Sequence, residues 1–98
     1  MNKERRKAIN KLIGEIQWIE NKMTALVQEM QEGVECINSD EQDAFDNMPE
    51  SLQYAEKGEA AQEAIYNLEY AENEIESWVS DISDKADEII GYLEEAKA

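Results

Sequence analysis

The chain has 98 residues, enough for one domain with a small core. It carries nine lysine and arginine residues against 24 aspartate and glutamate residues, a formal net charge of −15 at pH 7. So acidic a chain repels the phosphates of nucleic acids and anionic membrane surfaces, and we expect neither as a direct partner. The partners that remain are a basic protein surface, a cation, or a protein groove built for nucleic acid.

The cysteine content and the hydropathy pattern indicate a cytoplasmic protein. Cys36 is the only cysteine, so no internal disulfide forms and a secreted scaffold is not indicated. We interpret Cys36 as a small apolar residue buried at a helix end. No apolar run approaches the ~20 residues of a membrane span, and the residues after Met1 do not resemble a signal peptide.

The first predicted helix begins near Lys3 and ends near residue 35. Its apolar residues recur at alternating intervals of three and four, which keeps their side chains on one side of a helix. This main stripe consists of Ile9, Leu12, Ile16, Ile19, Met23, Leu26, Met30, Gly33 and Ile37. Ile13, Val27 and Val34 widen the stripe along one edge, as expected for a helix with more than one neighbour. Gly33 stands where a helix commonly ends.

An elbow is predicted between about residues 38 and 58. Ser39 and Gln42 have the spacing of a capping box, which opens a short helix. Pro49 forces the preceding residue out of helical geometry and suits the first turn of a further segment, Glu50–Tyr54. Gly58 is a candidate break or kink.

The second long helix is predicted over about residues 59–96. Its apolar residues recur every seven positions, at Ala61, Leu68, Ile75, Ile82, Ile89 and Ala96. Their apolar companions are Ala64, Ile65, Ala71, Trp78, Val79, Ala86, Tyr92 and Leu93. Such a repeat indicates helix–helix packing, and we assign Trp78 to the core. Lys85 falls at an apolar position, so a globular hairpin or bundle fits better than a two-stranded zipper.

Together these elements predict an all-α fold, an antiparallel hairpin of two long amphipathic helices joined by the short helical elbow. Residues 1–22 carry six basic and three acidic residues, whereas residues 23–98 carry three basic residues and 21 acids. Antiparallel packing therefore brings a basic start beside an acidic end. The residues concerned are Arg5, Arg6 and Lys7 at the start and Glu88, Glu94 and Glu95 at the end. Two helices bury little apolar surface, so we expect a homodimer that completes a bundle.

The chemistry of catalysis is missing from this sequence. There is no histidine, the commonest general base and metal ligand, and nothing to activate Cys36 as a nucleophile. The four glycines are scattered, so no phosphate-binding loop forms. A calcium loop that begins at Ser39 would place Ala44 where the turn requires glycine, and Pro49 interrupts it. We predict no enzyme activity, no catalytic residues, no cofactor and no metal site.

Acidic residues and tyrosines on the second long helix are the candidate partner-binding residues. The set is Glu63, Tyr66, Glu69, Tyr70, Glu72 and Glu76. A row of carboxylates along a helix imitates the charges of duplex nucleic acid, although a merely solvated face has the same pattern. The tyrosines either anchor a partner or lie over a helical interface. Trp18, off the main stripe, either covers the edge of the bundle or belongs to a binding surface.

A basic cluster near the start offers an alternative site. Arg5, Arg6, Lys7 and Lys11 would bind an anion, and an oligomer could then act as a sponge that sequesters a nucleotide signal. A structural assembly protein without a ligand is the third hypothesis.

The elbow and the helix after it resemble a known family. The run Glu41-Gln42-Asp43-Ala44-Phe45-Asp46-Asn47-Met48-Pro49-Glu50-Ser51-Leu52-Gln53 is followed by Gly58-Glu59 and Glu63-Ala64-Ile65-Tyr66-Asn67-Leu68-Glu69. This pattern is similar to that of small, acidic, helical and mostly uncharacterised proteins of phages and prophages in Gram-positive bacteria. The resemblance covers about residues 40–72 and also includes the basic residues at the start of the chain, residues 3–7.

The resemblance implies a phage setting, in which small acidic proteins often block host defence. It therefore favours an inhibitor that binds a nucleic-acid-handling defence protein of the bacterial host. The segment Asp43–Gln53 fits a structural elbow and a contact surface equally well at this stage.

Overall fold

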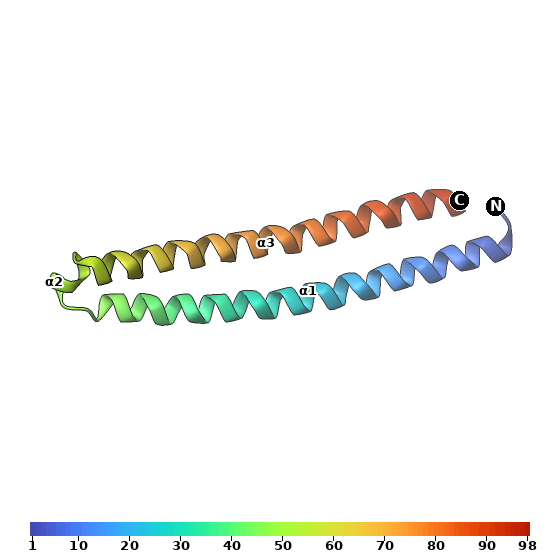
Figure 1. Ribbon diagram of the computed structural model, residues 1–98. Coiled ribbons are helices and arrows are strands. Elements are labelled where there is room, and N and C mark those ends of the chain that lie inside the picture. The colour runs from blue at the N-terminus through green and yellow to red at the C-terminus, as the bar shows by residue number, and fades with distance from the viewer. The chain divides into compact units, whose positions relative to one another are not determined.

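The computed structural model describes residues 1–98 and contains three α-helices and no strand, which confirms the all-α class. The helices are α1 (Lys3–Asp46), α2 (Glu50–Gln53) and α3 (Glu56–Lys97) (Figure 1). None of them combines the length and the apolar content that a membrane span requires. The chain forms two compact units: unit 1 consists of residues 1–28 and 78–98, and unit 2 of residues 29–77. Each unit therefore contains one stretch of α1 and one of α3.

In unit 1 the two helical stretches run antiparallel, as predicted. Arg6 Nε donates a hydrogen bond to the carbonyl oxygen of Lys97 (3.0 Å), and Lys97 Nζ donates to Asn10 Oδ1 (2.7 Å). Further along the pair, Ser83 Oγ donates to Glu20 Oε1 (3.0 Å). The start of α1 therefore lies beside the end of α3, where both termini are found (Figure 1).

No ion pair joins the basic start of α1 to the acidic end of α3. Glu88 pairs with Lys85 (3.2 Å) and Glu94 with Lys97 (3.0 Å), both within α3. A lysine three residues away on the same helix reaches a glutamate with little loss of side-chain freedom. Arg5, Arg6 and Lys7 were predicted to neighbour Glu88, Glu94 and Glu95; they form no ion pair with them, and the contact at this end is the hydrogen bond from Arg6 to the Lys97 carbonyl.

Unit 2 is a helical hairpin closed by α2. Here Asn38 Nδ2 of α1 donates to Glu72 Oε1 of α3 (3.3 Å), in a partly buried position. The Asn38 Oδ1 atom is buried and has no hydrogen-bond partner. A polar pair of this kind between apolar neighbours fixes the register of two helices, at some cost in stability.

Helix α1 extends further than its predicted end near residue 35. It passes through Gly33 and Ser39 and ends at Asp46, so the separate short helix predicted from Ser39 and Gln42 does not form. No glycine has a positive φ, so Gly33 does not act as a C-cap, and its cost inside a helix is only about 1 kcal/mol. The effective stop is Pro49, which keeps Met48 out of helical geometry.

Helix α2 follows Pro49, as predicted, and packs as a structural elbow. Gln53 Nε2 donates to the carbonyl oxygens of Phe45 (3.1 Å) and Met48 (3.2 Å), which lie at the end of α1. The Phe45 oxygen also accepts the backbone N–H of Met48 (3.1 Å), so Gln53 adds a second donor there and supplies a donor to the Met48 oxygen just past the helix end. The Asp43–Gln53 segment, undecided from sequence, thus has at least this structural role.

Gly58 lies inside α3 and does not break it, contrary to the prediction. The residue is buried, and a Cβ atom added to it would overlap the backbone of Gln53. Glycine is required here because α2 passes directly against the first turn of α3.

The core is small, and it lies along the edge of α1 and not along its main stripe. The buried residues are Ile13 and Val27 of α1 and Ala61, Ile65 and Ala86 of α3. The main stripe stays largely exposed, at Leu12, Ile19, Met23, Leu26, Met30 and Ile37. Helix α1 therefore has two adjacent apolar faces, of which the narrower contacts α3 and the wider has no partner within the chain.

Candidate binding surfaces

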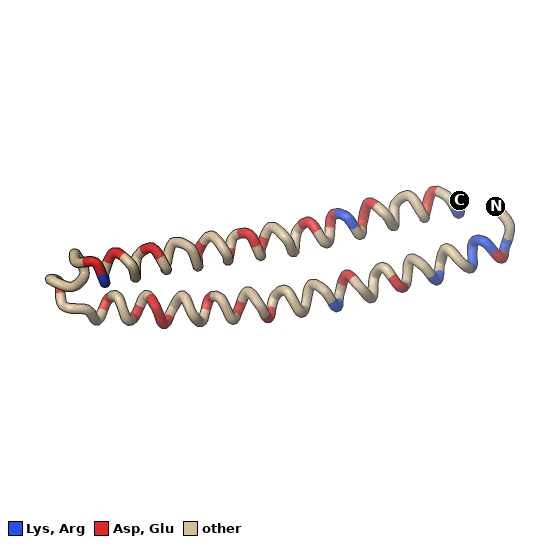
Figure 2. The backbone as a smooth tube through the Cα atoms, viewed as in Figure 1, with Lys and Arg blue, Asp and Glu red and all other residues tan.

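The two units differ sharply in charge. Unit 1 carries eight lysine and arginine residues and nine acids, whereas unit 2 carries one lysine, Lys57, and fifteen acids. Both salt bridges of the protein lie in unit 1, so no acid of unit 2 is paired with a cation. Figure 2 shows the basic residues gathered at the start of α1 and the acids along the stretches of unit 2.

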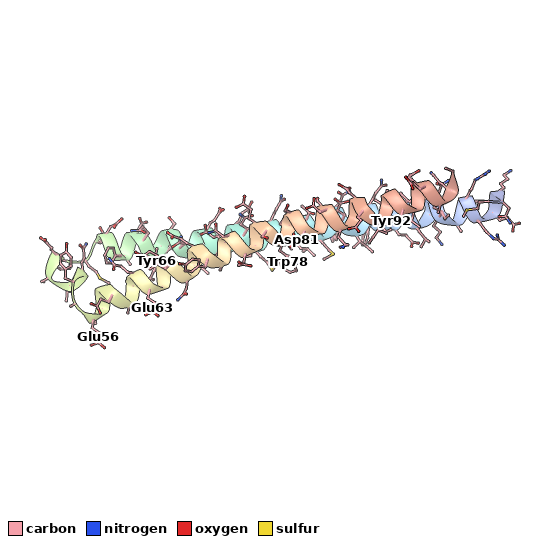
Figure 3. The ribbon with its side chains drawn as sticks, turned by 90° about the horizontal axis from the view of Figure 1, so that it is seen from above. Glu56, Glu63, Tyr66, Trp78, Asp81 and Tyr92 are labelled. Carbon is pink, nitrogen blue, oxygen red and sulfur yellow. The ribbon has the colours of Figure 1, made fainter.

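An acidic face with two tyrosines lies on the α3 stretch of unit 2. Glu59, Glu63, Tyr66 and Tyr70 follow one another at intervals of three or four, so they share one side of the helix. All four are exposed, with Tyr66 at 59% and Tyr70 at 67%. Figure 3 labels Glu63 and Tyr66 on this stretch. We refer to these four residues as the acidic face.

The predicted partner-binding set divides between two sides of α3. Glu63, Tyr66 and Tyr70 belong to the acidic face. Glu69 and Glu76 are exposed but lie on the side of Glu72, three and four residues from it. Glu72 is half-buried and accepts the hydrogen bond from Asn38, so it belongs to the helix pair. Sequence spacing separates the two sides but does not show that Glu72 contacts α1, because its partner Asn38 lies on the other helix.

An apolar groove of about 500 Å³ lies on unit 1, between α1 and α3. Its apolar lining is Ile16, Ile19 and Met23 from α1 and Trp78, Ile82, Ala86 and Ile89 from α3. Glu20, Asp81 and Lys85 complete the lining. The assignment of Trp78 to the core was wrong: its side chain is 47% exposed and borders this groove (Figure 3). In the sequence, the sign of this groove was the wide apolar stripe of α1, which indicated that the helix has more than one neighbour.

The four basic residues of the alternative anion site do not converge. Arg5, Arg6, Lys7 and Lys11 are all exposed. Consecutive helical residues point about 100° apart, so Arg5, Arg6 and Lys7 face different directions. Arg6 is also bound to the Lys97 carbonyl.

Two further aromatic and sulfur-containing side chains are open to solvent. Trp18 is 66% exposed and borders a second depression, together with Lys11 and Glu15. It therefore does not cover an edge of the helix pair within the chain. Cys36 is exposed in the interior of α1, so its interpretation as a buried residue at a helix end was wrong. The longer α1 accounts for this error, because residue 36 no longer lies near a terminus.

The fold and these surfaces define a class of protein: an all-α chain with a small core, one acidic surface and one apolar surface. No group of histidine, cysteine, aspartate and glutamate side chains is arranged to hold a metal ion. Comparisons with protein-family models, with curated proteins and with solved structures found no match.

Proposed function

We propose that this chain is a non-catalytic binding protein of phage or prophage type. It acts in the cytoplasm of the bacterial host and inhibits a defence protein that handles nucleic acids. In this proposal the acidic face occupies the basic surface on which the host protein normally binds nucleic acid. The observation that carries the proposal is the charge of unit 2, where fifteen acids meet one lysine and no cation is paired with any of them.

Uncompensated charge of this density has a physical consequence. The carboxylates repel one another in the free protein, and a basic partner would relieve that repulsion. The same field speeds the encounter with a basic surface. Tyr66 and Tyr70 supply large, rigid contact area beside the two glutamates of the acidic face, and aromatic residues are common energetic anchors of interfaces.

The family resemblance supports the phage setting but brings no activity with it. The resemblance covers residues 40–72, and this range includes most of the elbow and the acidic face. The absence of histidine from the sequence supports a role in binding and not in catalysis.

The structure favours one of the two alternatives, the nucleotide sponge and the assembly protein, over the other. A nucleotide sponge needs a convergent anion site, but only Lys7 and Lys11 share a side of the helix, whereas Arg5 and Arg6 point in other directions. An assembly protein without a ligand needs only a surface for self-association, and the exposed main stripe of α1 is such a surface. We include self-association in the proposal, as a homo-oligomer that presents the acidic face to its partner.

The proposal is tested by capture of partners from a Gram-positive host lysate, followed by measurement of their affinity. The double substitution Glu59→Lys/Glu63→Lys should weaken binding at least about tenfold, because it reverses two charges on the acidic face. The matched control is Asp84→Lys/Asp87→Lys, which changes the net charge equally but lies on unit 1, outside the lining of the apolar groove.

Two results would contradict the proposal. One is recovery of no basic protein, and the other is equal loss of affinity in both variants, which would indicate a response to net charge alone. Salt provides a further check: the association rate should fall several-fold between about 50 and 500 mM NaCl if charge drives the encounter.

A further inference from the structure

We propose that a second copy of this chain covers the apolar groove of unit 1, with the α1 helices of the two copies antiparallel around Ile19. The inference rests on the self-association included in the proposed function and names the surface and the orientation. The contact surface consists of Leu12, Ile16, Ile19, Met23 and Leu26 of α1, with Trp78 and Ile89 of α3 at its border.

The exposed area is what a dimer of substantial size requires. The chain exposes 7356 Å². A compact monomer of its mass, 11.2 kDa, would expose about 5,700 Å². The excess, roughly 1,700 Å², lies within the ~1,000–2,500 Å² that each partner contributes to an obligate homodimer. No side chain of the chain is fully buried, so a second copy would supply the missing core.

The charges of unit 1 allow two copies of the chain to associate through this unit, whereas those of unit 2 oppose association. With eight basic and nine acidic residues, two copies of unit 1 can meet with almost no net repulsion. Two copies of unit 2, with one lysine and fifteen acids each, would repel one another strongly. The groove therefore lies on the part of the molecule that self-association can use.

Two charged residues beside the stripe set the orientation. Glu15 and Lys22 are seven residues apart, and each directly precedes a stripe residue, Ile16 and Met23. Both are exposed and neither forms an ion pair within the chain. In an antiparallel helix pair, equivalent flanking positions face one another, so Glu15 of one copy faces Lys22 of the other, twice per dimer. A parallel pair would place Glu15 opposite Glu20 of the other copy and is disfavoured.

Sedimentation equilibrium of the full chain tests the oligomeric state. We expect twice the chain mass of 11.2 kDa at micromolar concentration, with a melting temperature that rises with protein concentration. Ile19→Glu and Met23→Glu should each weaken the dimer at least tenfold. Leu52→Glu is the matched control, since Leu52 is an exposed apolar residue on α2, outside the groove. A parent protein that stays monomeric at about 100 µM would overturn the proposal.

Charge exchange tests the orientation without inserting charge into the groove. Glu15→Lys and Lys22→Glu should each weaken the homodimer about tenfold, because two attractive pairs become repulsive. The double substitution Glu15→Lys/Lys22→Glu should restore it, and the two single variants should pair with each other when mixed. Circular dichroism establishes that each variant is helical. Strengthening by Glu15→Lys would indicate a parallel pair and, like failure of the single variants to combine, would refute the antiparallel dimer.

These outcomes are independent of the proposed inhibition. A dimer that captures no basic protein leaves this inference intact and removes the proposed function. A monomer that captures a basic protein through its acidic face removes this inference and the self-association, and leaves the proposed inhibition intact.

Discussion

In the elbow, we expect a substitution of Gly58 to be strongly destabilising. A Cβ atom on Gly58 would overlap the backbone of Gln53, and backbone cannot move aside as the end of a side chain can. We expect Gly58→Ala to lower the free energy of unfolding by about 1–3 kcal/mol, as overpacking usually does. Urea unfolding followed by circular dichroism measures the loss.

Gly33 is the control for that experiment. It lies inside α1, and nothing comes within 4 Å of an added Cβ atom. Gly33→Ala should therefore raise the free energy of unfolding by ~0.5–1 kcal/mol, because alanine loses less backbone entropy in a helix. Equal effects of the two substitutions would show that Gly58 is an ordinary helical glycine.

At the scale of elements, the end of α1 depends on Gln53. Its amide donates to the carbonyl oxygen of Phe45, in the last turn of α1, and to that of Met48, just past the helix end. Gln53→Ala should cost about 1–2 kcal/mol of unfolding free energy, the net value of two hydrogen bonds. Gln62→Ala, an exposed glutamine of α3, is the control and should change stability little. Alanine is the better helix former, so propensity cannot cause a loss, and the same loss in both variants would show that the hydrogen bonds of Gln53 do not hold the elbow.

The long helices could be predicted from sequence because their periodicity is strong, and the class and antiparallel direction followed from pattern and charge. The face by which α1 contacts α3 could not be predicted from the sequence. The main stripe is richer in large apolar residues than the edge containing Ile13 and Val27, yet the edge is buried. Periodicity reports how many apolar faces a helix has, but not which neighbour covers each one.

The end of α1 shows a second limit of local signals. Gly33 and the Ser39–Gln42 pair are each typical of helix boundaries, yet both lie inside α1. Their combined cost is small beside the gain from Val34 and Phe45, which are half-buried on the stretch of α1 between Gly33 and the proline. Pro49 acts through sterics and not through propensity, so it was the dependable boundary.

For the molecule as a whole, the sequence predicted an acidic surface but not its confinement to one unit. That confinement depends on which stretches of α1 and α3 lie together. The paired stretches of unit 1 combine the basic start with the acidic end, and their charges nearly cancel. Glu72 could not be assigned to the helix pair from sequence, because its partner Asn38 lies on the other helix.

The charge of unit 2 predicts an unusual response to salt. Like-charged residues three or four apart on a helix destabilise it by about 0.2–0.5 kcal/mol per pair. Such pairs in unit 2 are Glu29–Glu32, Glu32–Glu35, Asp40–Asp43, Asp43–Asp46, Glu56–Glu59, Glu59–Glu63, Glu69–Glu72 and Glu72–Glu76. Together they amount to roughly 2 kcal/mol of repulsion, which salt screens because the residues are mostly exposed. We therefore expect NaCl to stabilise the protein, whereas salt weakens proteins held by surface ion pairs.

Raising NaCl from about 10 to 500 mM should screen about half of this repulsion, and the ~1 kcal/mol gained should raise the melting temperature by ~4–8 °C in a chain of this size. Hydrogen exchange locates the effect: amides of residues 59–77 should gain protection with salt, and those of residues 3–28 should change less. Glu32→Gln/Glu59→Gln/Glu72→Gln removes a member from six of these pairs and should reduce the salt response by more than half. Equal gains of protection in both units would show that the repulsion is not concentrated in unit 2. That result would contradict the difference in charge between the units, on which the binding and dimer proposals depend.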